Sequence, residues 1–275
     1  AVVRIMMAAI AAMNLHTRLF DIGTAFLEGE LEEEIYVRLP SYLGGGIWCL
    51  LKALYGLKQA GHIFVKLLNG FLRALGFKQS KTEPQLFTLI TKLEGDELKK
   101  ADMPSRWNDY GYCIVSTYVD DIPAAANSPF LLDWVEDELK HRFKKVTCKD
   151  LRWFIGHQIS ITPGRVEISQ GQYVMQLIKR FEYELNLFCG KPIGGGGTIV
   201  PTARTPAEPG WVPSKAECPQ TEEDRLYCQS LPYREIVGGL LYCANSTRIN
   251  ILTITSQLAR FMSNFGFGHF MGALR

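Results

Sequence analysis

The tetrapeptide Tyr118-Val119-Asp120-Asp121 closes a β-favouring run that begins at residue 113. Neighbouring residues of a strand point to opposite faces of a sheet, so the chain must turn before both carboxylates can approach one site. Asp21 lies in a second β-like stretch, and a third carboxylate on an adjacent strand would complete an all-oxygen site for hard cations such as Mg²⁺. Two such ions roughly 4 Å apart can clamp the attacking and leaving oxygens of a phosphoryl displacement. The pattern therefore suggests nucleotidyl transfer.

The Asp pair also has a plainer interpretation, because acidic pairs are common in solvated turns. In that case the chain would be an unrelated α+β domain with a surface turn at Asp120 and Asp121. This alternative predicts no binding of duplex nucleic acid and no effect of divalent metals on stability.

Further motifs follow in a fixed order along most of the chain. They occupy residues 20–29, 33–37, 54–60, 83–87, 118–121, 152–156, 168–170, 233–242 and 260–264. Residues 54–60 read Leu-Tyr-Gly-Leu-Lys-Gln-Ala, which is far more specific than the acidic tetrapeptide alone. As an ordered set, the motifs resemble the reverse transcriptase domain of copia-like long-terminal-repeat retrotransposons.

The resemblance implies an α+β fold of the right-hand polymerase type, with a palm made of an antiparallel sheet and packed helices, a partial thumb and connection, and truncated fingers. Residues 1–165 would form the palm with a remnant of the fingers. Residues 166–275 would form a helical thumb and connection-like region, with a Gly- and Pro-rich linker at about 188–220. The segment 92–110 is polar and predicts a loop or hairpin.

Local patterns predict the elements more closely. Apolar periodicity and end signals predict helices at Val2–Met13, at 63–75 before Gly76, and from Pro129 to about Arg142, with two more within 233–262. Pro163-Gly164 predicts a hairpin turn. Ser169 and Gln172 resemble a capping box that opens a helix burying residues from Tyr173 to Phe181.

The resemblance assigns the catalytic acids to Asp21, Asp120 and Asp121. Asp21 and Asp120 would bind two Mg²⁺ ions, with Mn²⁺ as a possible substitute, and Ile22 would lend its backbone carbonyl. Clustered carboxylates repel one another unless cations neutralise them, which agrees with a metal site.

The resemblance also places the substrates, which would be an RNA template, a DNA primer and deoxynucleoside triphosphates. Ala25, Phe26 and Gln59 would contact the incoming nucleotide, and the Phe26 ring would exclude a 2′-hydroxyl by steric clash. The residues implied to contact the primer strand are Tyr118, Val119, Trp153, Phe154, Ile155 and Gly156. Taken without the resemblance, Phe26 and the Trp153-Phe154 pair are interpreted as ordinary core residues.

Charge and cysteine content add weaker limits. The net charge of +2 shows no strongly basic surface, although seven basic residues between 140 and 152 form a cluster that either faces phosphates or is a solvated helix end. The seven cysteines include no C-x-x-C pair, so neither a zinc site nor a disulfide framework is indicated. The apolar run at residues 5–13 is too short to span a bilayer and predicts a buried helix, with a signal peptide as the alternative. Localisation follows only from the family, as a cytoplasmic particle or the nucleus.

Several positions depart from the family pattern. The fingers segment with its triphosphate-binding Lys and Arg would lie before residue 1. Gly23, Gly61 and Lys149 replace a usual lysine, proline and glycine, while Pro123 falls in the strand expected to leave the Asp turn, where proline removes a ladder donor. These departures keep two alternatives open. In one, the chain is a catalytically inactive, transposon-derived relic that binds nucleic acid. In the other, Pro123 and the lost fingers prevent the chain from folding.

Overall fold

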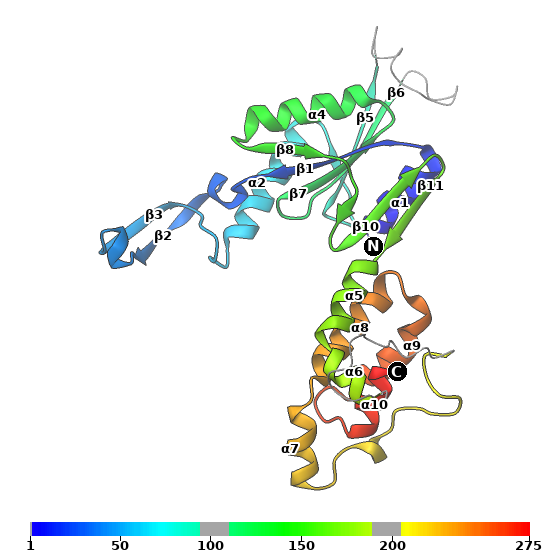
Figure 1. Cartoon of the computed structure of the whole chain (residues 1–275). Helices are drawn as coiled ribbons and strands as arrows, with labels where there is room; N and C mark the ends of the chain where they lie inside the picture. Colours follow the sequence, from blue (N-terminus) through cyan, green and yellow to red (C-terminus); the bar gives the residue numbers. More distant parts are fainter. Residues whose placement is uncertain (1, 94–109, 189–204) are drawn as a thin grey trace. The chain divides into compact units, whose positions relative to one another are not determined.

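The computed structural model describes residues 2–93, 110–188 and 205–275 (Figure 1). The chain divides into two compact units. The first unit comprises Ala1–Phe154 and Ile159–Glu167, and the second comprises Ile155–Gln158 and Ile168–Arg275. The chain as a whole mixes helices with antiparallel sheets, so the α+β class is confirmed.

A six-stranded antiparallel sheet forms the first unit, with strand order β4-β5-β6-β7-β1-β8. Its strands are β1 (His16–Ile22), β4 (Lys78–Gln79), β5 (Leu86–Lys92), β6 (Tyr110–Ser116), β7 (Asp121–Ala126) and β8 (Val146–Lys149). Strands β7 and β1 are neighbours although nearly a hundred residues separate them along the chain. This pairing is what brings the two acidic motifs together.

Two amphipathic helices, α2 (Ala60–Ala74) and α4 (Pro129–Arg142), share one hydrophobic cluster with the sheet. Phe20, Phe64 and Val135 are fully buried in that cluster. At about 25 cal/mol per Å² of buried apolar surface, this cluster is the main stabilising feature of the unit. Helix α1 (Val2–Met13) contacts β6 and buries Met6 and Ile10, as the sequence predicted.

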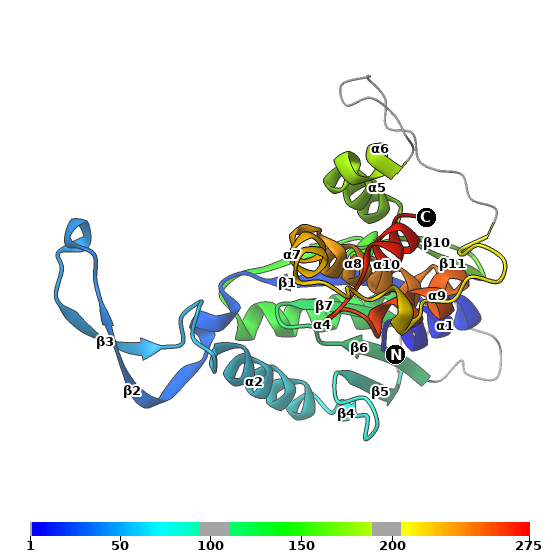
Figure 2. The same cartoon turned by 90° about the horizontal axis from the view of Figure 1, so that it is seen from below.

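Strands β2 (Glu30–Arg38) and β3 (Ile47–Lys52) form a separate two-stranded ribbon. It extends away from the six-stranded sheet in both views (Figure 1, Figure 2). The ribbon contributes almost nothing to the core, because Ile47, Trp48 and Leu51 are all exposed.

A small three-stranded sheet, in the order β11-β10-β9, follows the six-stranded one along the chain. It consists of β9 (Trp153–Phe154), β10 (His157–Thr162) and β11 (Arg165–Ser169). The predicted Pro163-Gly164 turn joins β10 to β11, with Gly164 at φ 70°. A two-residue turn, Ile155-Gly156, joins β9 to β10.

Helices dominate the second unit. They are α5 (Gly171–Arg180), α6 (Glu182–Phe188), α7 (Glu222–Ser230), α8 (Tyr233–Ser246), α9 (Leu252–Ala259) and α10 (Phe267–Leu274). Tyr233 lies at the centre of their shared core, fully buried, with its hydroxyl donating to the Leu258 carbonyl at 2.8 Å. Within the described residues, no helix is long and apolar enough to cross a membrane.

Most predicted helix bounds are confirmed, but the predicted capping box is wrong. The N-cap of α5 is Gln170, not Ser169, and the Ser169 hydroxyl accepts instead from the Gly171 backbone N–H at 3.1 Å. Tyr173 in α5 is only half-buried, and burial becomes complete at Phe181, just past the helix end. The Ser169 oxygen thus accepts from the residue two positions further on, and not three as a capping box requires.

Two predicted irregular segments lie partly outside the described residues. Of the loop expected at 92–110, residues 94–109 are outside. Of the linker expected at 188–220, residues 189–204 are outside, and the remainder contains one short 3₁₀ turn at Lys215–Glu217.

Pro123 lies within β7, an internal strand, and the ladder accommodates it. Asp121 exchanges both backbone hydrogen bonds with Tyr118, at 2.9 and 3.1 Å. Because the backbone N–H and C=O groups of successive strand residues point to alternate neighbours, those of Ile122 point toward β1 and the backbone of Pro123 points toward β6 again. The β6–β7 pairing begins only at Val115↔Ala124. The missing proline N–H thus falls where the ladder has no pair.

Candidate active site

The acidic residues predicted from the sequence meet at one end of the six-stranded sheet. Asp21 in β1 lies directly opposite Asp121 in β7. Asp120 precedes Asp121 in the turn between β6 and β7, and its carbonyl accepts from the Ile22 N–H at 3.1 Å. The predicted turn between the two strands is therefore present, and it places three carboxylates on adjacent backbone positions.

The turn itself is tight and strained. Two residues, Val119 and Asp120, connect Tyr118 to Asp121, and Val119 has φ 56°. A positive φ at the first central position alone is the sign pattern of a type II′ turn, which normally has glycine there. A β-branched residue in this region is an outlier, and such strain concentrates at functional sites.

The charges at this end of the sheet interact. Burial raises the pKa of Asp121, and repulsion from Asp120 and Asp21 raises it further, while Lys149 opposes the shift. Since Asp121 is only partly buried, solvent screens these effects. The direction nevertheless means that the charges of Asp120 and Asp21 reach the Asp121 carboxyl.

The donor set suits a hard divalent cation in kind, since it consists of carboxylates and a backbone carbonyl. In the part of the chain that the structure describes, however, no three His, Cys, Asp or Glu side chains converge closely enough to hold a metal ion. The Asp21 Oδ2 accepts from the Thr147 hydroxyl at 3.3 Å. The backbone thus brings the three acidic residues together, although their carboxylates do not form a closed ligand set.

The predicted nucleotide contacts surround the end of β1. Ala25 is fully buried in the 3₁₀ turn Ala25–Glu28, and Phe26 packs against the main core and contacts the Tyr55 ring at 4.5 Å. Gln59 directly precedes α2 and donates to the Glu33 carboxylate at 3.4 Å. Phe26 therefore has the core role that the sequence allowed, on the same segment as Asp21.

The predicted primer contacts divide into two kinds. Phe154 is buried and meets the Tyr118 ring edge-on at 6.2 Å, whereas Trp153 is 41% exposed. The core interpretation thus describes Phe154 but not Trp153. Ile155 and Gly156 both have positive φ, at 46° and 68°, which is the sign pattern of a type I′ hairpin turn.

A tyrosine from α8 holds this second turn. The Tyr242 hydroxyl donates to the Ile155 carbonyl at 2.8 Å, and it would lie 2.6 Å from a Cβ at position 156. The Tyr173 ring packs edge-on against Tyr242 at 4.7 Å. Glycine therefore suits position 156, because its φ is positive and a Cβ there would displace the Tyr242 hydroxyl.

Sequence reasoning missed several of these supporting residues. Thr147, Tyr55 and Tyr242 had no role assigned, and Lys149 was noted only as a departure from the family pattern and as a member of the basic cluster at 140–152. Their contacts depend on strand register and on helix packing, so no local sequence signal identifies them.

The basic cluster at 140–152 is partly neutralised. Lys140 pairs with Glu136 at 2.7 Å, and Arg152 pairs with Asp150 at 2.7 Å. Both lysine and arginine are well exposed, so these pairs contribute little to stability. The cluster consequently resembles a solvated helix end more than a dedicated phosphate surface.

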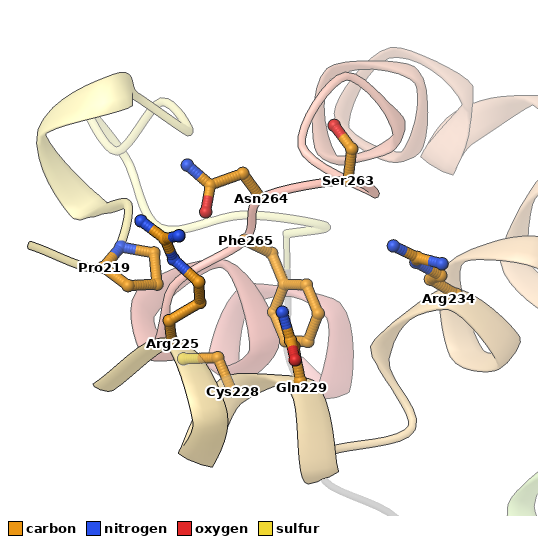
Figure 3. A pocket seen from close by; sticks show the side chains of 8 residues that line it. All are labelled: Pro219, Arg225, Cys228, Gln229, Arg234, Ser263, Asn264 and Phe265. Carbon is orange, nitrogen blue, oxygen red and sulfur yellow. The ribbon is translucent and has the colours of Figure 1, made fainter. Parts of the chain in front are cut away.

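A pocket of about 360 Å³ lies in the second unit between α7, α8 and the segment before α10 (Figure 3). Arg225 and Arg234 lie on opposite sides of it, with Phe265 between them. Arg225 pairs with Glu222 at 3.4 Å, and Arg234 donates to the Met262 carbonyl at 2.7 Å. Glu223 and Asp224 also begin α7, so the surroundings carry both signs of charge.

The family described as reverse transcriptase (RNA-dependent DNA polymerase) matches residues 1–194, so the chain belongs to that family. The chain is similar to the Retrovirus-related Pol polyprotein from transposon TNT 1-94 of Nicotiana tabacum, with 26% identity over 97% of this chain and 18% of the relative. It is also similar to the one from transposon RE1 of Arabidopsis thaliana, with 29% identity over 94% of this chain and 16% of the relative. It is, more particularly, a copia-like reverse transcriptase domain, as its motifs indicated.

A shorter relative gives the same result. The putative transposon Ty5-1 protein of Saccharomyces cerevisiae is 28% identical over 88% of this chain and 68% of the relative's own length. The chain spans less than a fifth of the two plant polyproteins. What such a whole polyprotein does is therefore a separate matter from what this chain does.

Proposed function

We propose that this chain carries the polymerase active site of an RNA-directed DNA polymerase. The first unit would be the palm with a remnant of the fingers, and the second would be the thumb and connection. The observation that supports this most strongly is the register of β1 and β7, which sets Asp21 opposite Asp121 beside Asp120. Carboxylates do not cluster at a sheet end without cost, and cation binding is the usual compensation.

Asp21, Asp120 and the Ile22 carbonyl would hold two Mg²⁺ ions, with Mn²⁺ as a substitute, and Asp121 would complete the acidic set. When bound, the ions would neutralise the triphosphate and lower the barrier to displacement at phosphorus. Burial and then the charges of Asp120 and Asp21 raise the pKa of Asp121, and a bound cation would favour the charged form of this carboxyl. Asp21 would bind the ion beside the contact that its Oδ2 makes with the Thr147 hydroxyl.

In the reaction, the primer 3′-hydroxyl attacks a deoxynucleoside triphosphate on an RNA template, and pyrophosphate leaves. Phe26 and Ala25 would lie under the incoming sugar, and Gln59 would contact the nucleotide from the start of α2. The Phe26 ring is held by Tyr55 and the core, so it is rigid enough to reject a 2′-hydroxyl by clash.

The two strained turns would hold the primer. Tyr118 and Val119 would lie beneath its 3′ end, and Trp153, Phe154, Ile155 and Gly156 would grip the strand. Rigid support matters here, since a misplacement of about 1 Å can cost on the order of a hundredfold in rate.

The test is extension of a DNA primer on an RNA template with Mg²⁺ or Mn²⁺. The Asp120→Ala variant should lose about a thousandfold in rate, because a bound metal contributes several kcal/mol of charge stabilisation. The matched control is Asp137→Ala, which removes one exposed carboxylate from α4. Retained primer–template binding without any extension would contradict the proposal and make the chain a binding relic. Equal loss in the control would point to misfolding instead.

A further inference from the structure

The turn between β9 and β10 is held by the helical unit. Residues Ile155–Gln158 belong to the second unit, although β9, which precedes them, belongs to the first. Within the second unit, the Tyr242 hydroxyl of α8 donates to the Ile155 carbonyl at 2.8 Å. Gly156 leaves room for this hydroxyl, because a Cβ there would lie 2.6 Å from it. The conformation of the turn therefore depends on a residue 87 positions further along the chain.

This hydrogen bond fixes the orientation of a whole peptide group. All peptide bonds of the described residues are trans, so the Ile155 carbonyl and the Gly156 N–H point in opposite directions. Holding the carbonyl toward Tyr242 thus sets the direction of the N–H as well. Ile155 has φ 46°, which a β-branched residue adopts only at a cost, and such a conformation persists where contacts from outside enforce it. Tyr242 supplies that contact.

The Tyr242 ring is in turn supported by α5. The Tyr173 ring packs edge-on against it at 4.7 Å, and the His157 ring lies 5.8 Å from it. Gly239 in α8 allows α5 to come this close, because a Cβ there would lie 2.6 Å from the Leu177 side chain and 3.3 Å from the Tyr173 hydroxyl. A tyrosine with two ring neighbours and a bonded hydroxyl has little freedom to rotate. The support that α8 gives to the turn is therefore rigid.

We propose that Tyr242 is a positioning residue of the polymerase, which orients the Ile155-Gly156 peptide and through it the primer 3′ end. This role rests on the proposed function, in which the turn contacts the primer strand. Tyr242 lies beyond residue 194, where the match to the reverse transcriptase family ends. The helical region after that point thus takes part in the reaction by placing the primer.

The first experiment compares single-turnover primer extension on an RNA template, with saturating Mg²⁺ and primer–template, in the wild-type chain and in Tyr242→Phe. Phenylalanine keeps the ring that packs against Tyr173 and removes only the hydroxyl. The rate constant of the turnover should fall about tenfold, since a displacement of about 1 Å can cost a hundredfold. A merely destabilised chain would instead lower the amplitude of the turnover and leave its rate constant unchanged.

The matched control is Tyr183→Phe. It removes a tyrosine hydroxyl from α6 of the same unit, where the side chain is exposed. Its rate constant should equal that of the wild type. Gly156→Ala is a second variant, because its Cβ would displace the same Tyr242 hydroxyl from the other side of the contact. It should slow the turnover as Tyr242→Phe does.

The second experiment needs no turnover. A primer with 2-aminopurine at its 3′ end reports the placement of that end by its fluorescence when the primer–template is bound without nucleotide. Tyr242→Phe and Gly156→Ala should both change the fluorescence of the bound primer relative to the wild type. Tyr183→Phe should not.

The outcomes separate this role from the proposed function. If the wild type extends the primer and Tyr242→Phe matches it in rate constant and fluorescence, the positioning role is overturned and the proposed function stands. A loss of amplitude alone would also overturn the role, because Tyr242 would then only stabilise the fold. If the wild type does not extend the primer, the proposed function is refuted, and fluorescence that still depends on Tyr242 would show that α8 places the bound primer end.

Discussion

Two hairpin turns of this chain solve the same geometric problem in different ways. The Val119-Asp120 turn joins β6 to β7, and the Ile155-Gly156 turn joins β9 to β10. Each begins with a β-branched residue at positive φ, 56° at Val119 and 46° at Ile155. Turn chemistry normally assigns such positions to glycine or asparagine, because a Cβ there meets the following carbonyl.

The turns differ in what holds them. The first is held by strand pairing, through the paired hydrogen bonds of Tyr118 and Asp121, and by the edge-on contact of the Tyr118 ring with Phe154. The second receives a hydrogen bond from Tyr242, and Gly156 leaves room for that hydroxyl. One strained turn thus carries charge at its surface, while the other is fixed by packing. Strain of this kind costs on the order of 1–3 kcal/mol and persists only where surrounding contacts enforce it.

The largest effect should come from filling the space under Tyr242. Gly156→Ala should lower the free energy of unfolding by about 2–3 kcal/mol, combining the left-handed backbone penalty with loss of one hydrogen bond. Urea denaturation measures it. Gly164→Ala is the matched control, since Gly164 has φ 70° but nothing within 4 Å of its Cβ position, and it should lose only the backbone part.

A double-mutant cycle sharpens this further. In a Tyr242→Phe background the hydroxyl is gone, so Gly156→Ala should cost about 1 kcal/mol less than in the wild type. If Gly156→Ala and Gly164→Ala destabilise equally, Tyr242 does not fix the turn and the contrast between the two turns disappears.

A smaller effect is expected from relieving the strain itself. Val119→Gly and Ile155→Gly should each raise the free energy of unfolding by about 0.5 kcal/mol, since a left-handed penalty of 1–2 kcal/mol exceeds the added entropy cost of glycine. Thermal unfolding would show it as a rise of one to two degrees, at about 2–4 °C per kcal/mol. A loss of stability at either position would mean that packing of the β-branched side chain stabilises the fold by more than its backbone strain costs.

The contrast between the turns also marks the limit of sequence reasoning. The strand-end turn at Asp120 and the helix at Pro129–Arg142 were predictable, because each depends on neighbours within a few residues. The Tyr242 bond to Ile155 spans 87 positions, and the Thr147 bond to Asp21 spans 126. Neither leaves a local signal. Propensity rules also work against Val119 and Ile155, so their conformation follows only from the assembled strands.

The pH dependence of stability should also distinguish the two turns, and this is the smallest of the predicted effects. The pKa of Asp121 is raised in the folded state, mainly by burial and then by Asp120 and Asp21, so the folded chain binds this proton more tightly than the unfolded chain. Stability therefore falls as pH rises from the ordinary aspartate pKa of about 3.9 through the raised value. Asp121→Asn removes this component, so its advantage over wild type should grow across that window, and Mg²⁺ at higher pH should reduce the advantage. Urea titrations at a series of pH values test it, with Asp137→Asn as the control. A difference that shrinks with rising pH would show that the carboxylates at the first turn do not repel one another.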